Sequence, residues 1–276
     1  MIKPLLVPYL MGQRRDGLRR VAPLRGQPWQ VVSAADPGPE RIVAKDQQLR
    51  SMEAVYARLA AAVRGVLRDG HFPCSLAGDC VSAMGMLAGL QQAGRAPRRI
   101  LWLDAHGDFH TWGTTQTQYL GGMPLAMLVG RPDRRGEQRD AIASLRNALG
   151  VRPYPERRVV LSDARDLDPG EDQALRRSAI VHCPLDAVLS HLHPQESLYV
   201  HFDTDVLDEP LRMPALKYHV PGGPRLEQMA QLFDRLRGYR LVALSVSAWH
   251  AEQDEDGQAA RACLALIERL LPDSGD

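Results

Sequence analysis

A chain of 276 residues, with 45% hydrophobic and 24% charged side chains, is long enough to bury a full core and has the composition of a soluble globular protein. Its 34 Lys and Arg residues nearly balance 33 Asp and Glu residues, so no net field favours nucleic acid or an anionic membrane as a partner. No stretch approaches the length of a membrane span, and prolines interrupt the N-terminal apolar run, which lacks a signal-peptide cleavage pattern. The 4 cysteines form no CxxC motif, and we expect free thiols in a reducing, cytoplasmic compartment.

Apolar runs and 3.6-residue periodicity alternate along the chain and predict alternating strands and helices. In chain order we expect a strand at 4–10, an irregular surface segment at 23–39, a helix at 46–68, a strand at 72–76, a helix at 81–93, a strand at 100–103, a helix at 123–129, a strand at 158–161, a helix at 171–177, a strand at 180–183, a helix at 187–191, a strand at 198–202, a helix at 226–236, a strand at 241–246 and a helix at 259–271. This alternation is typical of an α/β protein with a mostly parallel sheet covered on both faces. Without a repeat or a linker, we expect one domain over residues 1–276.

The stretch from Ile100 to Pro124 carries the first chemical motif. Asp104, His106 and Asp108 follow a short apolar strand at i, i+2 and i+4, so on extended chain their side chains project to the same side. Two carboxylates and an imidazole at a strand end can hold a divalent cation. Taken alone, the motif is equally compatible with a polar corner between strand and loop.

A second apolar strand, in the stretch 197–210, also ends in carboxylates. Asp203 and Asp205 share one face of extended chain, and Asp208 follows. Because the carboxyl ends of parallel strands gather at one edge of a sheet, the two motifs predict two halves of one metal centre, able to activate a water molecule.

These motifs are similar to the two main metal motifs of the arginase (ureohydrolase) superfamily. AGDC at 77–80 lies where that family has GGDH, and VPGGP at 220–224 resembles its downstream glycine turn. The resemblance extends over nearly the whole chain. It implies a three-layer αβα sandwich, a binuclear Mn²⁺ centre, hydrolysis of a guanidino or related C–N bond in a small-molecule substrate, and a homo-oligomer, either a trimer or a hexamer.

The resemblance also implies a ligand set. Asp104 and Asp203 match the ligands that bridge the two ions, whereas His106, Asp108 and Asp205 match ligands that hold one ion each. The family's remaining ligand, the histidine of GGDH, is replaced by Cys80. A thiolate is a soft donor that suits manganese poorly, so a weakened site or another metal preference is expected if Cys80 is a ligand. Cys80 could instead be a small buried hydrophobe. Asp208 is expected to buttress the site.

The substrate side of the family is matched by two segments. Asp166, Asp168 and Glu171, in RDLDPGE, take the positions of acidic groups that recognise an α-amino group, although a helix N-terminus also favours such residues. The loop after the first metal motif places other residues where arginases contact the head of the substrate: His110, Thr115, Thr117 and Tyr119.

Two departures concern the chemistry. Gly121 takes the place of a proton-shuttling histidine, and Ala248 the place of a glutamate that holds the guanidinium group. Both losses favour a less basic substrate, such as an N-hydroxyguanidine. Cys80, the YLGGM loop that contains Gly121, and the acidic segment from Asp166 to Glu171 together resemble the hydroxyarginine amidinohydrolase branch. That branch keeps an acidic residue near the last strand, so Ala248 departs from it.

The leading hypothesis is a metal-dependent amidinohydrolase that converts an arginine-like amino acid to ornithine and urea or hydroxyurea. Asp108 would hydrogen-bond the attacking hydroxide, and the candidate proton carriers are His110, His201 and His219. The alternatives are another hydrolase of the superfamily, with an agmatine, guanidino-acid or formimino substrate, and a catalytically weak binding protein that retains the fold.

Overall fold

The computed structural model describes residues 1–34, 44–132, 141–209, 213–216 and 218–272. Its centre is an 8-stranded sheet in the order β4-β1-β5-β10-β9-β6-β7-β8, and every pair of neighbouring strands is parallel. The strands are β1 (Ile2–Val7), β4 (Gln30–Val31), β5 (Phe72–Ala77), β6 (Arg99–Leu103), β7 (Val159–Ser162), β8 (Val181–Cys183), β9 (Leu198–Asp203) and β10 (Leu241–Ser247). A small antiparallel pair, β2 (Tyr9–Leu10) and β3 (Gln13–Arg14), follows β1.

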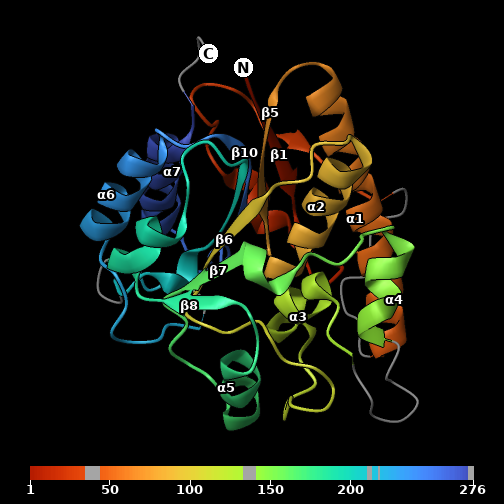
Figure 1. Ribbon diagram of the computed structural model, residues 1–276. Helices are drawn as coiled ribbons and strands as arrows, with labels where there is room; N and C mark the ends of the chain where they lie inside the picture. Colours follow the sequence, from red (N-terminus) through yellow and green to blue (C-terminus); the bar gives the residue numbers. More distant parts are fainter. Residues whose placement is uncertain (35–43, 133–140, 210–212, 217, 273–276) are drawn as a thin grey trace.

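Helices cover both faces of the sheet (Figure 1). One face carries α1 (Lys45–Arg68), α2 (Ala83–Gln92), α3 (Pro124–Val129) and α4 (Ala141–Ala148), and the other carries α6 (Leu226–Leu236) and α7 (Gln258–Leu270). Each layer buries its own apolar cluster against the sheet, with Tyr56, Leu59 and Trp102 in one and Phe202 and Phe233 in the other. The predicted three-layer αβα architecture with a parallel central sheet is therefore confirmed.

Most predicted elements appear within a few residues of their expected bounds. The segment 187–191, expected to be α-helical, lies in the 3₁₀ helix Leu185–His191, and the helix expected at 81–93 begins with a 3₁₀ turn at Cys80–Ser82. The segment 23–39 contains the short edge strand β4, and its residues 35–39 lie outside the described residues. Helix α4 was not predicted. Within the described residues, no helix is both long and apolar enough to cross a membrane.

The register of the central strands fixes where the site forms. Ser247 of β10 pairs with Ala77 of β5 on one side and with Asp203 of β9 on the other. On the far side of β9, Leu103 of β6 pairs with Phe202, which brings Asp104 to the same edge. Four strands that are remote in sequence therefore end side by side at the carboxyl edge of the sheet, where ligands bind in parallel α/β folds.

Candidate metal centre

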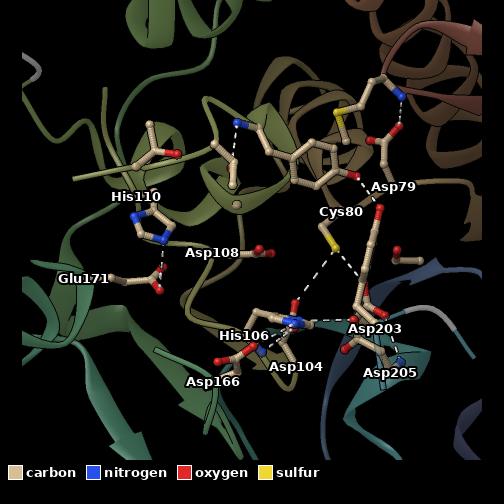
Figure 2. A pocket seen from close by; sticks show the side chains of 18 of the residues that line it. Asp79, Cys80, Asp104, His106, Asp108, His110, Asp166, Glu171, Asp203 and Asp205 are labelled. Carbon is tan, nitrogen blue, oxygen red and sulfur yellow. Dashed lines mark hydrogen bonds and ion pairs between the residues drawn. The ribbon is translucent and has the colours of Figure 1, made fainter. Parts of the chain in front are cut away.

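A pocket of about 220 Å³ opens at this edge of the sheet (Figure 2). It is lined by every residue that the sequence analysis proposed as a metal ligand or substrate contact: Cys80, Asp104, His106, Asp108, His110, Thr115, Thr117, Tyr119, Asp166, Asp168, Glu171, Asp203 and Asp205. Of the proposed proton carriers only His110 lines it: His201 is completely buried, and His219 bonds Asp208 instead. The pocket accommodates a small molecule.

One group of metal-type donors is formed by Asp104, His106 and Asp205. The Nδ1 of His106 lies 3.3 Å from Oδ1 of Asp104 and 3.2 Å from Oδ2 of Asp205. The backbone N–H of His106 also donates to Asp104 at 2.8 Å, and that of Ala105 to Asp205 at 3.3 Å. Main-chain donors thus hold both carboxylates; Oδ1 of Asp104 meets both the backbone N–H and the imidazole of His106, whereas Asp205 turns its second oxygen, Oδ2, toward the imidazole.

A second group lies beside it and consists of Cys80, Asp104, His201 and Asp203, all buried. The Cys80 thiol donates to Oδ2 of Asp203 at 2.7 Å and lies 3.8 Å from Oδ2 of Asp104. Asp104 belongs to both groups, so two cation positions would share this carboxylate. This position places Cys80 beside three other candidate donors, and its role as a metal ligand stays a prediction.

Asp108 is held in an unusual conformation. Its backbone has φ of +51°, which non-glycine residues rarely adopt, and such strain costs about 1–3 kcal/mol and concentrates at functional sites. The backbone N–H groups of Leu125 and Ala126, at the start of α3, donate to its carbonyl and fix this geometry. Its side chain accepts a hydrogen bond from Trp102 Nε1 at 3.2 Å, and the same N–H contacts Asp104 at 3.2 Å. Asp108 therefore lies beside the donor groups but in neither of them.

The buried acidic side chains of the pocket favour the binding of a cation. Burial and the charges of Asp203 and Asp104 raise the pKa of Asp205 well above its usual range, and burial, Asp104 and Asp203 do the same for Asp108. Burial alone would lower the pKa of His106, but hydrogen bonds and charges from Asp104 and Asp205 raise it to about 12. Burial lowers the pKa of His201 to about 4, which keeps that ring neutral. Oxygen and imidazole donors in a negative, buried cluster fit one or more divalent cations.

The acidic segment after β7 forms the opposite wall. The side chains of Asp166 and Asp168 remain 67% and 43% exposed, so they can meet a cationic group that enters from solvent. Glu171 is buried: it accepts the backbone N–H of Phe109 at 2.8 Å and lies 3.4 Å from Nε2 of His110. Burial raises the pKa of Glu171 to about 7. Glu171 thus holds the loop and His110, whereas the two aspartates face the entrance.

The loop residues leave hydroxyl groups for a ligand. Thr115 Oγ1 accepts the backbone N–H of Gln118, and Thr117 Oγ1 accepts that of Tyr119, so each hydroxyl proton can be donated into the pocket. His110 Nδ1 bonds Thr114 Oγ1 at 3.1 Å, and its Nε2 lies 3.4 Å from Asp168.

The two departures from the family pattern have different surroundings. A Cβ on Gly121 would overlap the ring of Tyr119, so the glycine leaves the space that this ring occupies. Ala248 is buried at the end of β10, its N–H donates to Ala77 at 2.8 Å, and its neighbour Ser247 lines the pocket.

Among the pocket residues that the sequence analysis overlooked, two make informative contacts. Asp79 accepts hydrogen bonds from Met11 N, Tyr56 Oη and Ser82 N at 2.6–3.0 Å and so positions the Cys80 turn; its place inside AGDC was a usable signal. Tyr218, 53% exposed, stacks edge-on against Tyr119 with ring centroids 6.1 Å apart, and no sequence pattern marked it.

A model of the arginase family matches residues 15–272. The chain belongs to the arginase family. It is 31% identical over 178 residues to an N(omega)-hydroxy-L-arginine amidinohydrolase of Streptomyces lavendulae, covering 63% of this chain and 59% of that protein. It is 30% identical over 254 residues to the arginase of Bacillus subtilis, covering 83% of this chain and 79% of that one. The crystal structure of Bacillus caldovelox arginase superposes with a TM-score of 0.79 at 24% identity, over 100% of this chain and 99% of that chain, and shows the shared fold.

Proposed function

We propose that this arginase-family protein is a metal-dependent amidinohydrolase that cleaves the guanidino C–N bond of an arginine-like amino acid, with N-omega-hydroxy-L-arginine as the preferred substrate. The observation that carries the proposal is the convergence of Asp104, Asp203 and Asp205 with His106 at the carboxyl edge of the sheet, inside a pocket of small-molecule size. The similarity to a hydroxyarginine amidinohydrolase supports the choice of substrate.

The proposed cofactor is Mn²⁺, with two ions per chain. The first would be held by Asp104, His106 and Asp205, and the second by Asp104, Asp203 and Cys80, with Asp108 alongside. Bound ions lower the pKa of a water molecule so that it can attack the guanidino carbon at neutral pH. The position of the ion next to the thiol is expected to bind manganese more weakly.

The chain's own residues would orient the substrate. Asp166 and Asp168 at the entrance would meet the α-ammonium group, and the hydroxyls of Thr115 and Thr117 would donate to the carboxylate. Tyr119 and Tyr218 would close the same side of the pocket.

Proton transfer is assigned to two residues. Asp108 would accept a hydrogen bond from the attacking water, and His110, within 3.4 Å of Asp168 and Glu171, would carry a proton toward the departing nitrogen. The products are ornithine and hydroxyurea, or ornithine and urea when the substrate is arginine. A cytoplasmic location and a homo-oligomer, trimer or hexamer, remain predictions.

Ornithine release by manganese-loaded protein, measured in parallel with hydroxyarginine, arginine and agmatine, tests the proposal. We expect the highest kcat/KM with hydroxyarginine. Asp205→Asn should abolish turnover, whereas the matched control Asp186→Asn, on the exposed 3₁₀ helix Leu185–His191, should not. Preference for agmatine would support the alternative hydrolase. Bound metal without turnover of any of the three would contradict this substrate class, and no metal and no turnover would favour the binding-protein alternative.

A further inference from the structure

His201 has an unused imidazole nitrogen beneath the metal centre. The side chain is completely buried, its Nδ1 lies 2.7 Å from Ser245 Oγ, and its Nε2 has no hydrogen-bond partner within the described residues. A buried polar nitrogen without a partner costs about 1–3 kcal/mol, so in a native structure it calls for an explanation.

The sheet register places this ring directly under the proposed ligands. His201 of β9 pairs with Ser245 of β10 and with Trp102 of β6, two residues before Asp203 on the same strand. Because side chains alternate along a strand, His201 and Asp203 project to the same face. The ring stacks on Trp102 at 3.9 Å between centroids, which fixes its plane.

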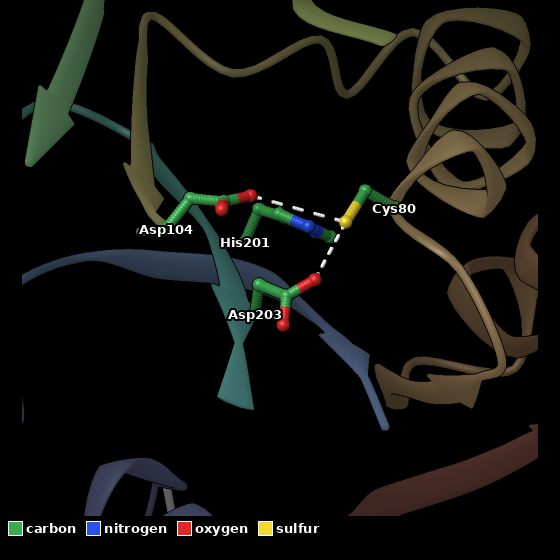
Figure 3. A group of neighbouring side chains, drawn as sticks. All are labelled: Cys80, Asp104, His201 and Asp203. Carbon is green, nitrogen blue, oxygen red and sulfur yellow. Dashed lines mark hydrogen bonds between the residues drawn. The ribbon is translucent and has the colours of Figure 1, made fainter. Parts of the chain in front are cut away.

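The ring also belongs to the second donor group. One donor atom each of Cys80, Asp104, His201 and Asp203 lies within 4.8 Å of every other (Figure 3). In Figure 3 the sulfur of Cys80 lies beside the imidazole of His201, and dashed lines join it to the carboxylates of Asp104 and Asp203. Four donors around one point, with thiolate, imidazole and carboxylate chemistry, form a set that a single divalent ion accepts.

We propose that His201 is a metal ligand and that the ion next to Cys80 is held by Cys80, Asp104, Asp203 and His201. This inference rests on the proposed metal centre and adds a ligand to it. Where the family resemblance places a histidine ligand the chain has Cys80, which follows β5, and the imidazole comes instead from β9, on the far side of β10.

Ser245 and Tyr199 complete the arrangement. When His201 donates Nδ1–H to Ser245 Oγ and that hydroxyl donates to Tyr199 Oη, 2.5 Å away, Nε2 carries the free lone pair. Metal-binding histidines commonly donate their second ring nitrogen in this way, and loss of such a partner lowers metal affinity about 10–100-fold. Ser245 is therefore a positioning residue for His201.

The test loads metal-free protein with Co²⁺ and records hyperfine-shifted ¹H NMR signals from protein deuterated everywhere except at the histidine rings. The wild type should show two shifted imidazoles, His106 and His201, and His201→Phe should show one. Calorimetric titration should give at least a tenfold loss of affinity for one equivalent of Co²⁺ in His201→Phe, by analogy with the effect of outer partners.

His182→Gln is the matched control, because its Nε2 already bonds the Ala164 carbonyl at 2.8 Å and it lies on β8 outside the pocket. It should keep both signals and both affinities. Ser245→Ala should keep two shifted imidazoles but weaken Co²⁺ binding.

A single shifted imidazole in the wild type overturns the inference even if the variant fails to fold. Unchanged affinity and two signals in His201→Phe overturn it as well. In both cases the bound cobalt leaves the proposed function standing. A wild type that takes up no cobalt would remove the metal centre itself, and the inference with it.

Discussion

Replacing Asp203 by asparagine should stabilise the metal-free protein while reducing its stabilisation by metal. Asp203 and Asp104 offer donor oxygens within 4.8 Å of one another, both buried. For two unit charges at that separation and an effective dielectric constant of 20, the repulsion is about 3.5 kcal/mol. Asn keeps the Oδ1 that accepts the Asp205 N–H at 2.9 Å, so the turn survives. After loss of the Cys80 hydrogen bond, we expect a net gain of about 1–3 kcal/mol.

Urea denaturation with a chelator and with Mn²⁺ measures both effects. At manganese concentrations 100-fold above Kd each bound ion should stabilise the wild type by about 2.7 kcal/mol. Asp203→Asn should lose the contribution of the ion next to Cys80 and keep that of the ion held by Asp104, His106 and Asp205. Asp208→Asn is the matched control: its carboxylate bonds His219 at 2.8 Å and lies outside both donor groups, so the manganese gain should persist. A metal-free Asp203→Asn protein less stable than wild type, or one with the full manganese gain, would refute the reasoning.

Three further predictions concern neighbouring groups. Cys80→Ala should remove the thiolate-to-metal absorption of the cobalt protein and lower metal affinity at least tenfold, whereas Cys74→Ala, a thiol equally buried on β5, should change neither. Burial raises the pKa of Glu171 to about 7, so this residue stabilises the fold at low pH and the contribution is lost as pH rises from about 4.5 to about 7. In Glu171→Gln the free energy of unfolding should therefore change less with pH, by at most about 3 kcal/mol over this range. Identical stability–pH curves for the two proteins would contradict this. Gly121→Ala should destabilise by about 1–3 kcal/mol because its Cβ meets the Tyr119 ring, and a double-mutant cycle with Tyr119→Ala should show most of that cost relieved.

Much of the fold was readable from the sequence because its strongest signals are local. The apolar runs of β6 and β9 and the helical period of α1 and α6 depend on residues close together in the chain. Helix α4 was not predicted, although it follows the same rule. The strand order, with β10 between β5 and β9, requires contacts between distant segments, and no periodicity reports these.

The candidate site was predicted to a similar extent and for the same reason. Period-two spacing placed Asp104 beside His106 and Asp203 beside Asp205, and the pocket contains all four. His201 was considered only as a proton carrier, because its donor group depends on the register of β9 with β6 and β10. The position of His201 next to the donors is set by hydrogen bonding and stacking between strands, and residue spacing along one strand does not reveal it.

The departures from the family pattern differ in what surrounds them. These surroundings help to distinguish a site that has lost its function from one with an altered substrate preference. Protein interiors are close-packed, so a side chain lost without replacement leaves a cavity or an unpaired group. At Gly121 the ring of Tyr119 fills the space, and at Cys80 the imidazole of His201 joins the donor group, so both positions are exchanges. Ala248 shows no such exchange within the described residues, since Ser247 faces the pocket instead. Without a carboxylate at that point, the pocket cannot form a charge-assisted hydrogen bond to a guanidinium group. This loss weakens the binding of a cationic guanidinium more than that of the weakly basic N-hydroxyguanidine. Ala248→Glu should therefore raise kcat/KM for arginine relative to hydroxyarginine, and an unchanged ratio would show that this position does not set the preference.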